Sequence, residues 1–566
     1  MRVGIQRVLF IVVLIIIGYL VIPPLFFTFR ESLHFAKGFQ TPEFSFKNYT
    51  DVFSFSDTPK MIFNSFWFSI GSSVIGLIMG TLLAWIVERT NTPFKKLAYL
   101  SAFLSLGTPL IIRVIGWILL TGPEAGLINV WLRNLLGLER SPCNIFTMTG
   151  MILIQGLFWS PVVFLFMSAP FRSMDPSLEE SASMSGAWVA KTFYHITFKL
   201  ARPSVLAVLL LTFIRTIESF EIPALIGIPS GIRVLTTEIF LKITSGLIPQ
   251  YGLASAYAII LIFFVSVGLY FYSRATREAQ RFSTITGKGF RPRLTDIGKW
   301  RYLTTGLIFI FPILMSLPFL ALLWASFLPY YMKPSFAALS SLTIANYFSA
   351  FKSHLIVDAI RNSVFISLCS ATATMLLTAV TAWVVVRTNI RGKWLLDHLA
   401  SFTLVFPGVV LGVALLVTYL TLPIPLYGTL WILVIAYITR YTPYGIRYCY
   451  PGLLQISKEL EESAQMSGAP WGTVFRKIVV PLMMPSLFAG WIFIFLLSVR
   501  ELSVAILLSR PGSQVIAVAI YDMWDDGEIV QIAAFSICLT ALLVAIAAGF
   551  YKLSTRYGLQ TQQERV

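Results

Sequence analysis

Twelve runs of apolar residues divide this sequence of 566 residues, and each is long enough to cross a lipid bilayer as a helix, which takes about 20 residues. A bilayer offers the backbone no hydrogen-bond partners, so each run must satisfy its own polar groups by forming a helix. The runs lie at 8–29, 62–87, 97–121, 147–170, 201–224, 251–273, 303–328, 359–386, 397–420, 428–449, 483–506 and 530–551. The sequence therefore predicts an all-α membrane protein with twelve transmembrane helices.

Charged residues are few and lie mostly between these runs. They make up 12% of the chain, whereas soluble domains carry about 25%. The net charge of +17 comes from short basic segments such as 88–96, 387–393 and 274–301, and not from one stripe of the kind that binds nucleic acid. Basic loops stay in the cytoplasm, and an even number of spans returns the chain to the side where it began. We therefore expect both termini in the cytoplasm, a lipid bilayer around the chain, and no nucleic-acid partner.

The second half of the chain repeats the first. The segment LEESASMSGA at 178–187 returns as LEESAQMSGA at 460–469, 282 residues later, with nine of ten positions identical. Two other segments, NYTDVF at 48 and AWIVERTN at 84, return as NYFSAF at 346 and AWVVVRTN at 382, 298 residues later. The two shifts differ by 16 residues, so the first half carries an insertion of that length between Pro109 and Pro161. It is expected in the external loop at 122–146.

This repeat predicts the domain organisation. Residues 1–273 form a first transmembrane unit, 274–302 a basic cytoplasmic linker, and 303–566 a second unit. Six spans in each unit give the two units the same orientation, so they are parallel repeats related by an axis along the membrane normal. A path for solute is then expected between them, lined by the fifth and eleventh helices.

The repeated decapeptide follows an even-numbered span in each half and is predicted to be cytoplasmic. Asp175 and Ser457 precede the two copies and are good helix N-caps, while Gly186 and Gly468 permit a sharp turn. Each copy should therefore be a short helix with a glycine bend. A surface helix that merely links two spans would explain one copy, but two nearly identical copies on one face favour a partner with two equivalent grooves.

The second copy fits the pattern E-A-A, three residues, G, nine residues, I-x-L-P, which is the cytoplasmic signature of permease subunits of bacterial ATP-binding-cassette importers with the type I fold. Glu462, Ala464, Gly468, Ile478 and Pro481 hold the matching positions. The first copy supplies Glu180, Ala182, Gly186 and Ile196. Ser181 and Ser463 depart from the pattern at the first Ala, and Phe198-Lys199 replaces Leu-Pro in the first copy. Over nearly its whole length the chain resembles two such permeases fused end to end.

The resemblance implies a transport subunit of the bacterial inner membrane, not an enzyme. It implies a coupling helix in each half, with Glu180 and Glu462 near the contacts with a dimer of ATPase subunits, and a periplasmic substrate-binding protein on the other side. The chain has no G-x-x-x-x-G-K-[ST] loop, because its Gly-Lys pairs at 287–288, 298–299 and 392–393 lack the following Ser or Thr. We therefore expect no cofactor on this chain, and ATP and magnesium on the partner subunits.

The segments TRYTPYGIRY (439–448), 500–528 and 218–240 look most like fused permeases for ferric iron. Related fused permeases carry thiamine, unfused ones carry polyamines, and a phosphonate is a further alternative within the same type of importer. An ion-coupled secondary transporter is the alternative from another class, since it also uses repeats and intramembrane charges. It would have no need of paired docking helices.

Ionisable residues fall inside the fifth and eleventh predicted spans. Glu218 and Glu221 lie in the fifth, and Arg500 and Glu501 in the eleventh, where charges are expensive and usually functional. They are candidates for the substrate pathway, and the carboxylates of Glu218 and Glu501 would suit transient contact with iron(III). The alternative is structural, with Arg215 paired to Glu218 at helical spacing.

A group of acidic residues follows the eleventh span on the external side. It comprises Asp522, Asp525, Asp526 and Glu528. Contact with the substrate-binding protein and a solvated helix start are both open interpretations of this group.

Overall fold

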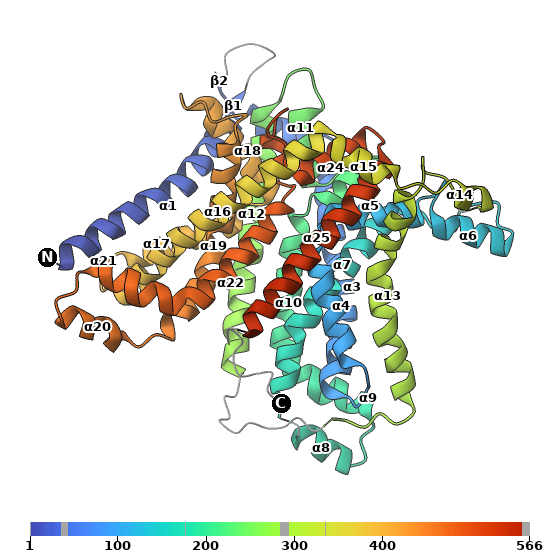
Figure 1. Ribbon diagram of the computed structural model, residues 1–566, viewed down its shortest axis with the longest axis horizontal. Helices are drawn as coiled ribbons and strands as arrows, with labels where there is room; N and C mark the ends of the chain where they lie inside the picture. Colours follow the sequence, from blue (N-terminus) through green and yellow to red (C-terminus); the bar gives the residue numbers. More distant parts are fainter. Residues whose placement is uncertain (1, 36–42, 176, 283–293, 334, 557–566) are drawn as a thin grey trace.

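The computed structural model describes residues 2–35, 43–175, 177–282, 294–333 and 335–556, and most of them are helical. Two groups of long helices meet at one end of the molecule and diverge toward the other (Figure 1). In the described residues the strands are limited to the hairpin of β1 (His34–Phe35) and β2 (Glu43–Phe44), with His34 opposite Phe44. The predicted all-α fold is confirmed.

Nine helical stretches among the described residues are long and apolar enough to cross a membrane. They are α1 (Arg2–Ser32), α3 (Thr58–Arg89), α7 (Met148–Ser173), α9 to α10 (Val189–Thr192, η1 Phe193–Thr197, Phe198–Ile217), α12 (Tyr251–Phe282), α13 (Trp300–Ser326), α16 (His354–Arg387), α21 to α22 (Trp471–Val474, η4 Phe475–Val479, Val480–Val499) and α25 (Ile529–Arg556). The expected span at 428–449 forms α19 (Leu430–Leu454), but Arg440 and Arg447 lower its hydropathy and it is not one of the nine.

Two of the expected spans are bent in the middle. The helix α4 (Lys95–Gly107) meets α5 (Leu110–Thr121) at 106°, and α17 (Lys393–Phe402) with the turn η3 (Thr403–Val405) meets α18 (Gly408–Thr421) at 108°. Pro109 and Pro407 occupy the two bends, where a missing N–H and a steric clash oppose continuation of the helix. The continuous helices expected at 97–121 and 397–420 are thus pairs of half-helices. With each pair counted once, the described residues contain up to eleven spans, and the count of twelve stays a prediction.

The fifth and eleventh spans end earlier than expected. The helix α10 stops at Ile217 and α22 at Val499, and the chain then unwinds before the short η2 (Pro223–Gly227) and α23 (Ala505–Leu508). The four candidate pathway residues therefore lie at the breaks and not within continuous helices, which corrects the expected spans at 201–224 and 483–506. Irregular backbone is tolerated at membrane depth when it is buried in protein, as it is here.

Short helices lie at both ends of the bundles. Near the end where the bundles meet are α2 (Lys47–Ser54), α11 (Leu235–Thr244), α15 (Ala345–Lys352) and α24 (Ile516–Asp525), with α6 (Leu127–Leu136) and α14 (Phe336–Ser340) to one side (Figure 1). The 16-residue insertion falls in the segment that contains α6, as expected. At the diverging ends lie α8 (Ser177–Met184) and α20 (Lys458–Met466).

The repeated Asn-Tyr pair fastens these short helices to the long ones. The Asn48 amide donates to the carbonyls of Ser32 and His34 at 3.1 and 2.8 Å. In the second half the Asn346 amide donates to Ser326 and Leu328 at 2.9 and 2.6 Å. In both halves the repeated segment thus holds an amphipathic helix against the C-terminal end of the first span, which accounts for the recurrence of NYTDVF as NYFSAF.

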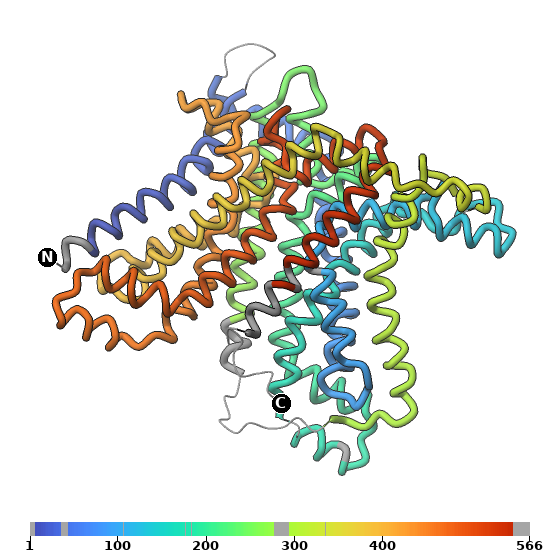
Figure 2. The backbone as a smooth tube through the Cα atoms, in the orientation of Figure 1, coloured from blue at the N-terminus to red at the C-terminus, as the bar shows by residue number. Residues whose placement is uncertain are grey.

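The first helix of each half packs against the other half. The N-terminal helix α1 contacts α16, α17 and α18 as well as α12, and the Tyr19 and Tyr419 hydroxyls lie 3.1 Å apart. Reciprocally, α13 packs on α4 and α5, and Tyr331 donates to the carbonyl of Leu119 at 3.1 Å. Figure 2 shows α1 running along the side of the second-half helices. The predicted boundaries at 273 and 303 thus do not separate two independently packed bodies.

The two most closely packed helices of each half meet at a glycine. In the first half the glycine lies on the earlier helix of the pair, and in the second half it lies on the later one. In the first half, a Cβ on Gly80 would lie 2.5 Å from the Cβ of Val163, so α3 and α7 touch there. In the second half the same two positions are Thr378 and Gly445, and a Cβ on Gly445 would lie 2.6 Å from the Thr378 hydroxyl. The larger side chain of the contact therefore lies on α7 in the first half but on α16 in the second, and the two helices touch in both cases.

This exchange predicts a rescue. Gly445→Val should overpack α16 against α19 and destabilise the protein by about 1–3 kcal/mol. Adding Thr378→Gly recreates the first-half pair and should recover most of the loss, less about 1 kcal/mol for glycine in a helix. Thermal unfolding of the detergent-purified chain measures both. Gly306→Val is the matched control, since a Cβ there meets nothing within 4 Å. A double variant no more stable than Gly445→Val would contradict the exchange.

Candidate functional site

The two copies of the decapeptide fold as predicted into short capped helices. Before α8, the Asp175 carboxylate accepts a hydrogen bond from the Ser177 N–H at 2.9 Å. Before α20, the Ser457 hydroxyl accepts from the Glu459 N–H at 3.3 Å. Gly186 and Gly468 follow with φ of +78° and +84°, a region that favours glycine. Both helices therefore end in a left-handed bend, as the sequence indicated.

Each helix exposes an apolar ridge at equivalent positions. Leu178 and Leu460 are both 48% exposed, and Met184 and Met466 are 90% and 86% exposed. Ala182 and Ala464 lie half-buried behind the ridges, and Glu462 is exposed and pairs with Lys458 at 3.1 Å. Exposed apolar residues that recur on two copies at one side of a molecule mark a contact surface. We call Leu178 with Met184, and Leu460 with Met466, the two docking ridges. The helices that carry them, α8 and α20, are the first and second docking helices.

A buried arginine ties each of these helices to a membrane helix. At the end of α3, Arg89 Nη2 lies 2.5 Å from Glu179 Oε2, and the Arg89 side chain is fully buried. At the end of α16, Arg387 Nε lies 2.8 Å from Glu461 Oε1. The positions are equivalent in the repeat, as the matching AWIVERTN and AWVVVRTN segments show. We call these ion pairs the two struts.

The struts also hold the preceding membrane helices. Arg89 donates to the carbonyls of Phe171 and Met174 at 3.4 and 3.2 Å. Arg387 donates to the equivalent carbonyls of Leu453 and Ile456 at 3.1 and 2.5 Å. Each guanidinium therefore joins three elements: the second span of its half, the end of the fourth, and the docking helix.

Aromatic residues complete each strut. Trp383 Nε1 donates to Glu461 Oε2 at 3.0 Å, and its ring lies 5.0 Å from that of Trp471. In the first half, Trp85 contacts the ring of Phe193 at 5.0 Å, and Thr197 donates to Glu179 Oε1 at 2.6 Å.

Our sequence reasoning selected Glu180 and Glu462 and missed Glu179, Glu461 and the arginines. The signal for the arginines was their retention in both copies beside Glu88, which becomes Val386.

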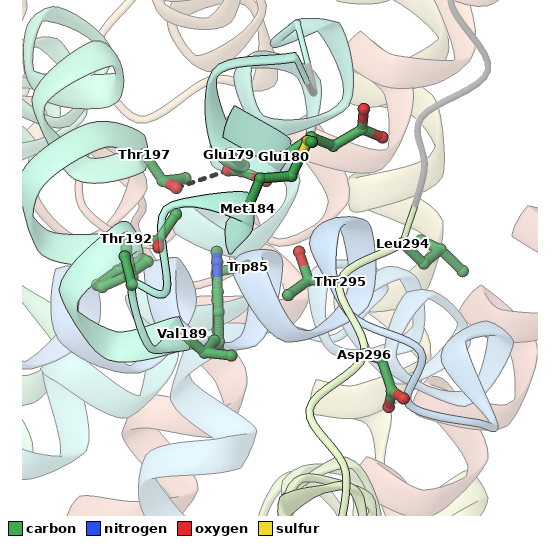
Figure 3. Close-up of a pocket in the computed structure, with 12 residues that line it drawn as sticks. Trp85, Glu179, Glu180, Met184, Val189, Thr192, Thr197, Leu294, Thr295 and Asp296 are labelled. Carbon is green, nitrogen blue, oxygen red and sulfur yellow. Dashed lines mark hydrogen bonds between the residues drawn. The ribbon is translucent and has the colours of Figure 1, made fainter. Parts of the chain in front are cut away.

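The first docking helix also borders the linker between the halves. Thr295 pairs with Thr90, its N–H donating to the Arg89 carbonyl at 2.8 Å, and Asp296 accepts from the Asn91 amide at 2.7 Å. A pocket of about 390 Å³ lies between this linker segment, α8 and the start of α9. Figure 3 shows Glu180, Met184 and the residues from Leu294 to Asp296 around it.

The second candidate site lies where the two halves meet. Ser503 donates to Glu221 Oε1 at 3.3 Å, and these residues hold equivalent positions in the repeat, 282 apart. Equivalent positions can touch only close to the axis that relates the two halves. The breaks after α10 and α22 therefore meet on this axis, which brings the four candidate pathway residues of the sequence together.

Two of the carboxylates at this junction, Glu218 and Glu501, already have cationic partners. Arg215 Nη1 lies 2.9 Å from Glu218 Oε2, and Arg440 Nε lies 3.0 Å from Glu501 Oε2. Glu501 also accepts from the Tyr441 hydroxyl at 2.9 Å and the Val504 N–H at 3.2 Å. The structural pairing of Arg215 with Glu218 is thus present. The described residues contain no group of three His, Cys, Asp or Glu able to hold a metal ion, so iron contact at Glu218 and Glu501 stays a prediction.

The acidic group that the sequence predicts to be external lies on and after α24. Asp522 accepts from the Gln514 amide at 2.9 Å, while Asp525 ends the helix and Asp526 follows it as C-cap. Burial raises the pKa of the Asp522 carboxyl, and the Gln514 hydrogen bond opposes that shift. The other three acidic residues remain available to a partner on this side of the molecule.

The sequence matches a described family in both halves. The model of the "Binding-protein-dependent transport system inner membrane component" family matches residues 72–277 and 374–556. The ferric transport system permease protein FbpB of Actinobacillus pleuropneumoniae is 24% identical over 497 residues, which are 87% of this chain and 70% of that protein. The putative ferric transport system permease protein FbpB 1 of Haemophilus influenzae is 24% identical over 461 residues, 81% of this chain and 71% of that protein.

Two further similarities each cover less than half of the chain. The spermidine/putrescine transport system permease protein PotC of Escherichia coli K12 is 29% identical over 195 residues, 34% of this chain and 73% of that protein. Among solved structures, a bacterial ABC transporter involved in the import of alginate gives a TM-score of 0.36 at 23% identity, covering 46% of this chain and 88% of that one.

Proposed function

Because the chain belongs to the family of binding-protein-dependent transport system inner membrane components, we propose that it forms the membrane path of an importer for ferric iron. Family membership makes it a multi-pass permease of the inner membrane, a transport subunit and not an enzyme. Iron as the cargo is supported by the two ferric transport permeases, which align with more than four fifths of the chain.

The observation that carries the coupling role is the pair of docking ridges. Two equivalent helices, each with an exposed Leu and Met, fit the two equivalent grooves of an ATPase dimer. They lie at the diverging ends of the two bundles, α8 at the bottom and α20 at the lower left of Figure 1. ATP and magnesium are bound by those partner subunits, with no cofactor on this chain.

Transport follows from a shift between two states. When ATP closes the partner dimer, α8 and α20 approach each other, and the struts carry that movement to α3 and α16 because each guanidinium is bonded to both elements. The path between the halves then opens outward, and hydrolysis returns it to the cytoplasmic side. The divergence of the bundles toward α8 and α20 is the arrangement expected of the inward state (Figure 1).

The membrane orientation follows from the same surfaces. The N-terminal end of α1 and the C-terminal end of α25 lie toward the side that carries α8 and α20 (Figure 1), which supports cytoplasmic termini. The opposite end, with α11 and α24, then faces the periplasm and receives a substrate-binding protein at the acidic group on and after α24. Solute passes along the axis, beside Glu218, Glu221, Arg500 and Glu501.

The test is uptake by proteoliposomes that contain this chain, its ATPase and its binding protein. Labelled iron(III), thiamine, a polyamine and 2-aminoethylphosphonate are offered separately, and we expect ATP-dependent entry of iron. Met184→Glu with Met466→Glu should abolish uptake and release the ATPase, because both side chains are exposed and the fold does not need them. Leu247→Glu, an equally exposed apolar residue at the other end of the molecule, should leave ATPase co-purification unchanged.

Three outcomes would contradict this assignment. Entry of another solute in place of iron would leave the assignment as an importer intact but would contradict iron as its cargo. Co-purification of the ATPase with the double Met variant would contradict the proposed role of the docking ridges in binding the ATPase. Uptake driven by an ion gradient without any ATPase would make the chain a secondary transporter instead.

A further inference from the structure

The junction on the axis holds more positive than negative charge. Its ionisable residues come from both halves, from the breaks after α10 and α22 and from the neighbouring helices α5 and α19. The cations are Arg113, Arg215, Arg440 and Arg500, and the anions are Glu218, Glu221 and Glu501. Four cations face three anions, so this stage of the path is hostile to a bare trivalent cation.

Arg113 makes no ion pair with a carboxylate in the part of the chain that the structure describes. Its residue is 8% exposed, Nη1 donates to the Ser105 hydroxyl at 2.8 Å, and the guanidinium lies 4.3 Å from the centre of the Phe158 ring. Within the described residues its Nε has no hydrogen-bond partner, and the charged group near enough to act on it is another arginine, Arg500. A buried charge without a counter-ion is costly, so an arginine kept in this position needs an anion from elsewhere.

The half-helices add positive potential at the same place. Arg113 is the fourth residue of α5, and its bond to Ser105 crosses the bend between α4 and α5. The equivalent helix α18 begins at Gly408, where a Cβ would lie 2.6 Å from Ser503 Cβ and 2.8 Å from Arg440 Nη1. Free N–H groups at the start of a helix attract anions, and broken membrane helices present such ends to anionic groups of a cargo.

We propose that the cargo crosses as an anion: iron(III) moves together with an oxyanion ligand, whose phosphate or carboxylate oxygens are held by Arg113 and Arg500 at the start of α5. This inference deepens the proposed function and rests on iron being the cargo. The guanidinium of Arg113 is packed in the present state, so the anion binds when the two halves separate and expose it. Arginine suits the task because its planar donors match carboxylate and phosphate oxygens in pairs.

The same arrangement explains the paired glutamates. Glu218 and Glu501 each hold an arginine through Oε2, and the negative charge of each carboxylate is therefore already balanced by a fixed cation. The oxyanion instead neutralises the ion before it reaches the axis, and the positive cluster then attracts the complex as a whole. Iron coordination stays with the ligand that travels, and the permease binds the outer oxygens of that ligand.

The test uses the complete importer in proteoliposomes with doubly labelled cargo: radiolabelled iron(III) with labelled phosphate in one arm and with labelled citrate in the other. We expect one of the two anions to enter in fixed proportion to iron, and the arm in which it does identifies the source of the oxyanion. Arg113→Gln should lower that uptake about tenfold to a hundredfold, the value of a charge-assisted hydrogen bond in a dry site. Arg113→Lys, which keeps the charge, should recover part of it.

A matched control is Arg361→Gln, which changes an exposed arginine near the start of α16 and should leave uptake unchanged. Loss of folding is measured separately as thermal stability, which Arg113→Gln should not lower, because it removes a buried unpaired charge. Iron entry without either anion, or uptake indifferent to Arg113→Gln, would overturn the inference. No iron entry in any arm would instead overturn the proposed cargo, and entry of the anion alone would do the same while leaving the oxyanion site in place.

Discussion

Arg387→Gln should abolish ATP-driven uptake and lower the stability of the protein by about 3–5 kcal/mol, because it leaves Glu461 as a buried carboxylate without its cation. The variant also removes two hydrogen bonds that fix the end of α19. Since the guanidinium is the group that joins α20 to α16, movement of the docking helix no longer reaches the membrane. Thermal unfolding and proteoliposome uptake measure the two effects.

A second variant separates stability from coupling. Arg387→Gln with Glu461→Gln removes both charges and should regain much of the lost stability, yet it should not regain uptake. Lys458→Gln is the stability control, because it breaks the surface ion pair of Lys458 with Glu462. These side chains are 61% and 55% exposed, and such a pair contributes about 0–1 kcal/mol to stability. Full uptake by the double variant would show that the strut only holds the fold. The equivalent Arg89→Gln should behave in the same way in the first half.

Gly186→Val with Gly468→Val should cause the second large loss, with the membrane domain still folded. Both glycines have positive φ, where an L side chain costs about 1–2 kcal/mol, and a Cβ at either meets nothing within 4 Å. The effect is therefore conformational: each docking helix leaves its required direction, and uptake should fall about tenfold for each bend. Uptake per reconstituted protein and ATPase co-purification are the measurements.

The chain offers a matched control for this pair. Gly472 lies in the short helix α21 with helical backbone and equally open space, so Gly472→Val makes the same chemical change without the left-handed strain. It should retain most of the uptake. Equal losses from Gly472→Val and Gly468→Val would mean that bulk at the docking surface matters and the bend does not.

The long apolar runs and the internal repeat carried most of the fold. The two shifts, 298 and 282, correctly paired Asn48 with Asn346 and placed the insertion at the loop that holds α6. The bends at Pro109 and Pro407 were not predictable from the prolines themselves. Pro161 and Pro443 form an equally well-matched pair and lie inside the unbroken helices α7 and α19. Tertiary packing decides which prolines end a helix.

The candidate site was only partly visible for a related reason. The caps and bends of the docking helices are local, so Asp175, Ser457 and the glycines could be identified from their neighbours in sequence. The two struts join residues that are 90 positions apart in the first half (179 − 89) and 74 in the second (461 − 387). Basic residues at span ends are already explained by membrane orientation. Arg89 and Arg387 therefore looked ordinary until their carboxylate partners were placed beside them.

The packing of α1 on the second half has a consequence for how the chain is made. The helix ends at Ser32, and its partner α18 begins at Gly408, so 376 residues separate the two surfaces along the chain. At a synthesis rate of about 5–20 residues per second, α1 waits roughly 20–75 seconds before that surface exists. During that time lipid or the insertion machinery must cover the face that later contacts α16, α17 and α18. The helix α1 therefore reaches these final neighbours only after the greater part of the following chain has been made.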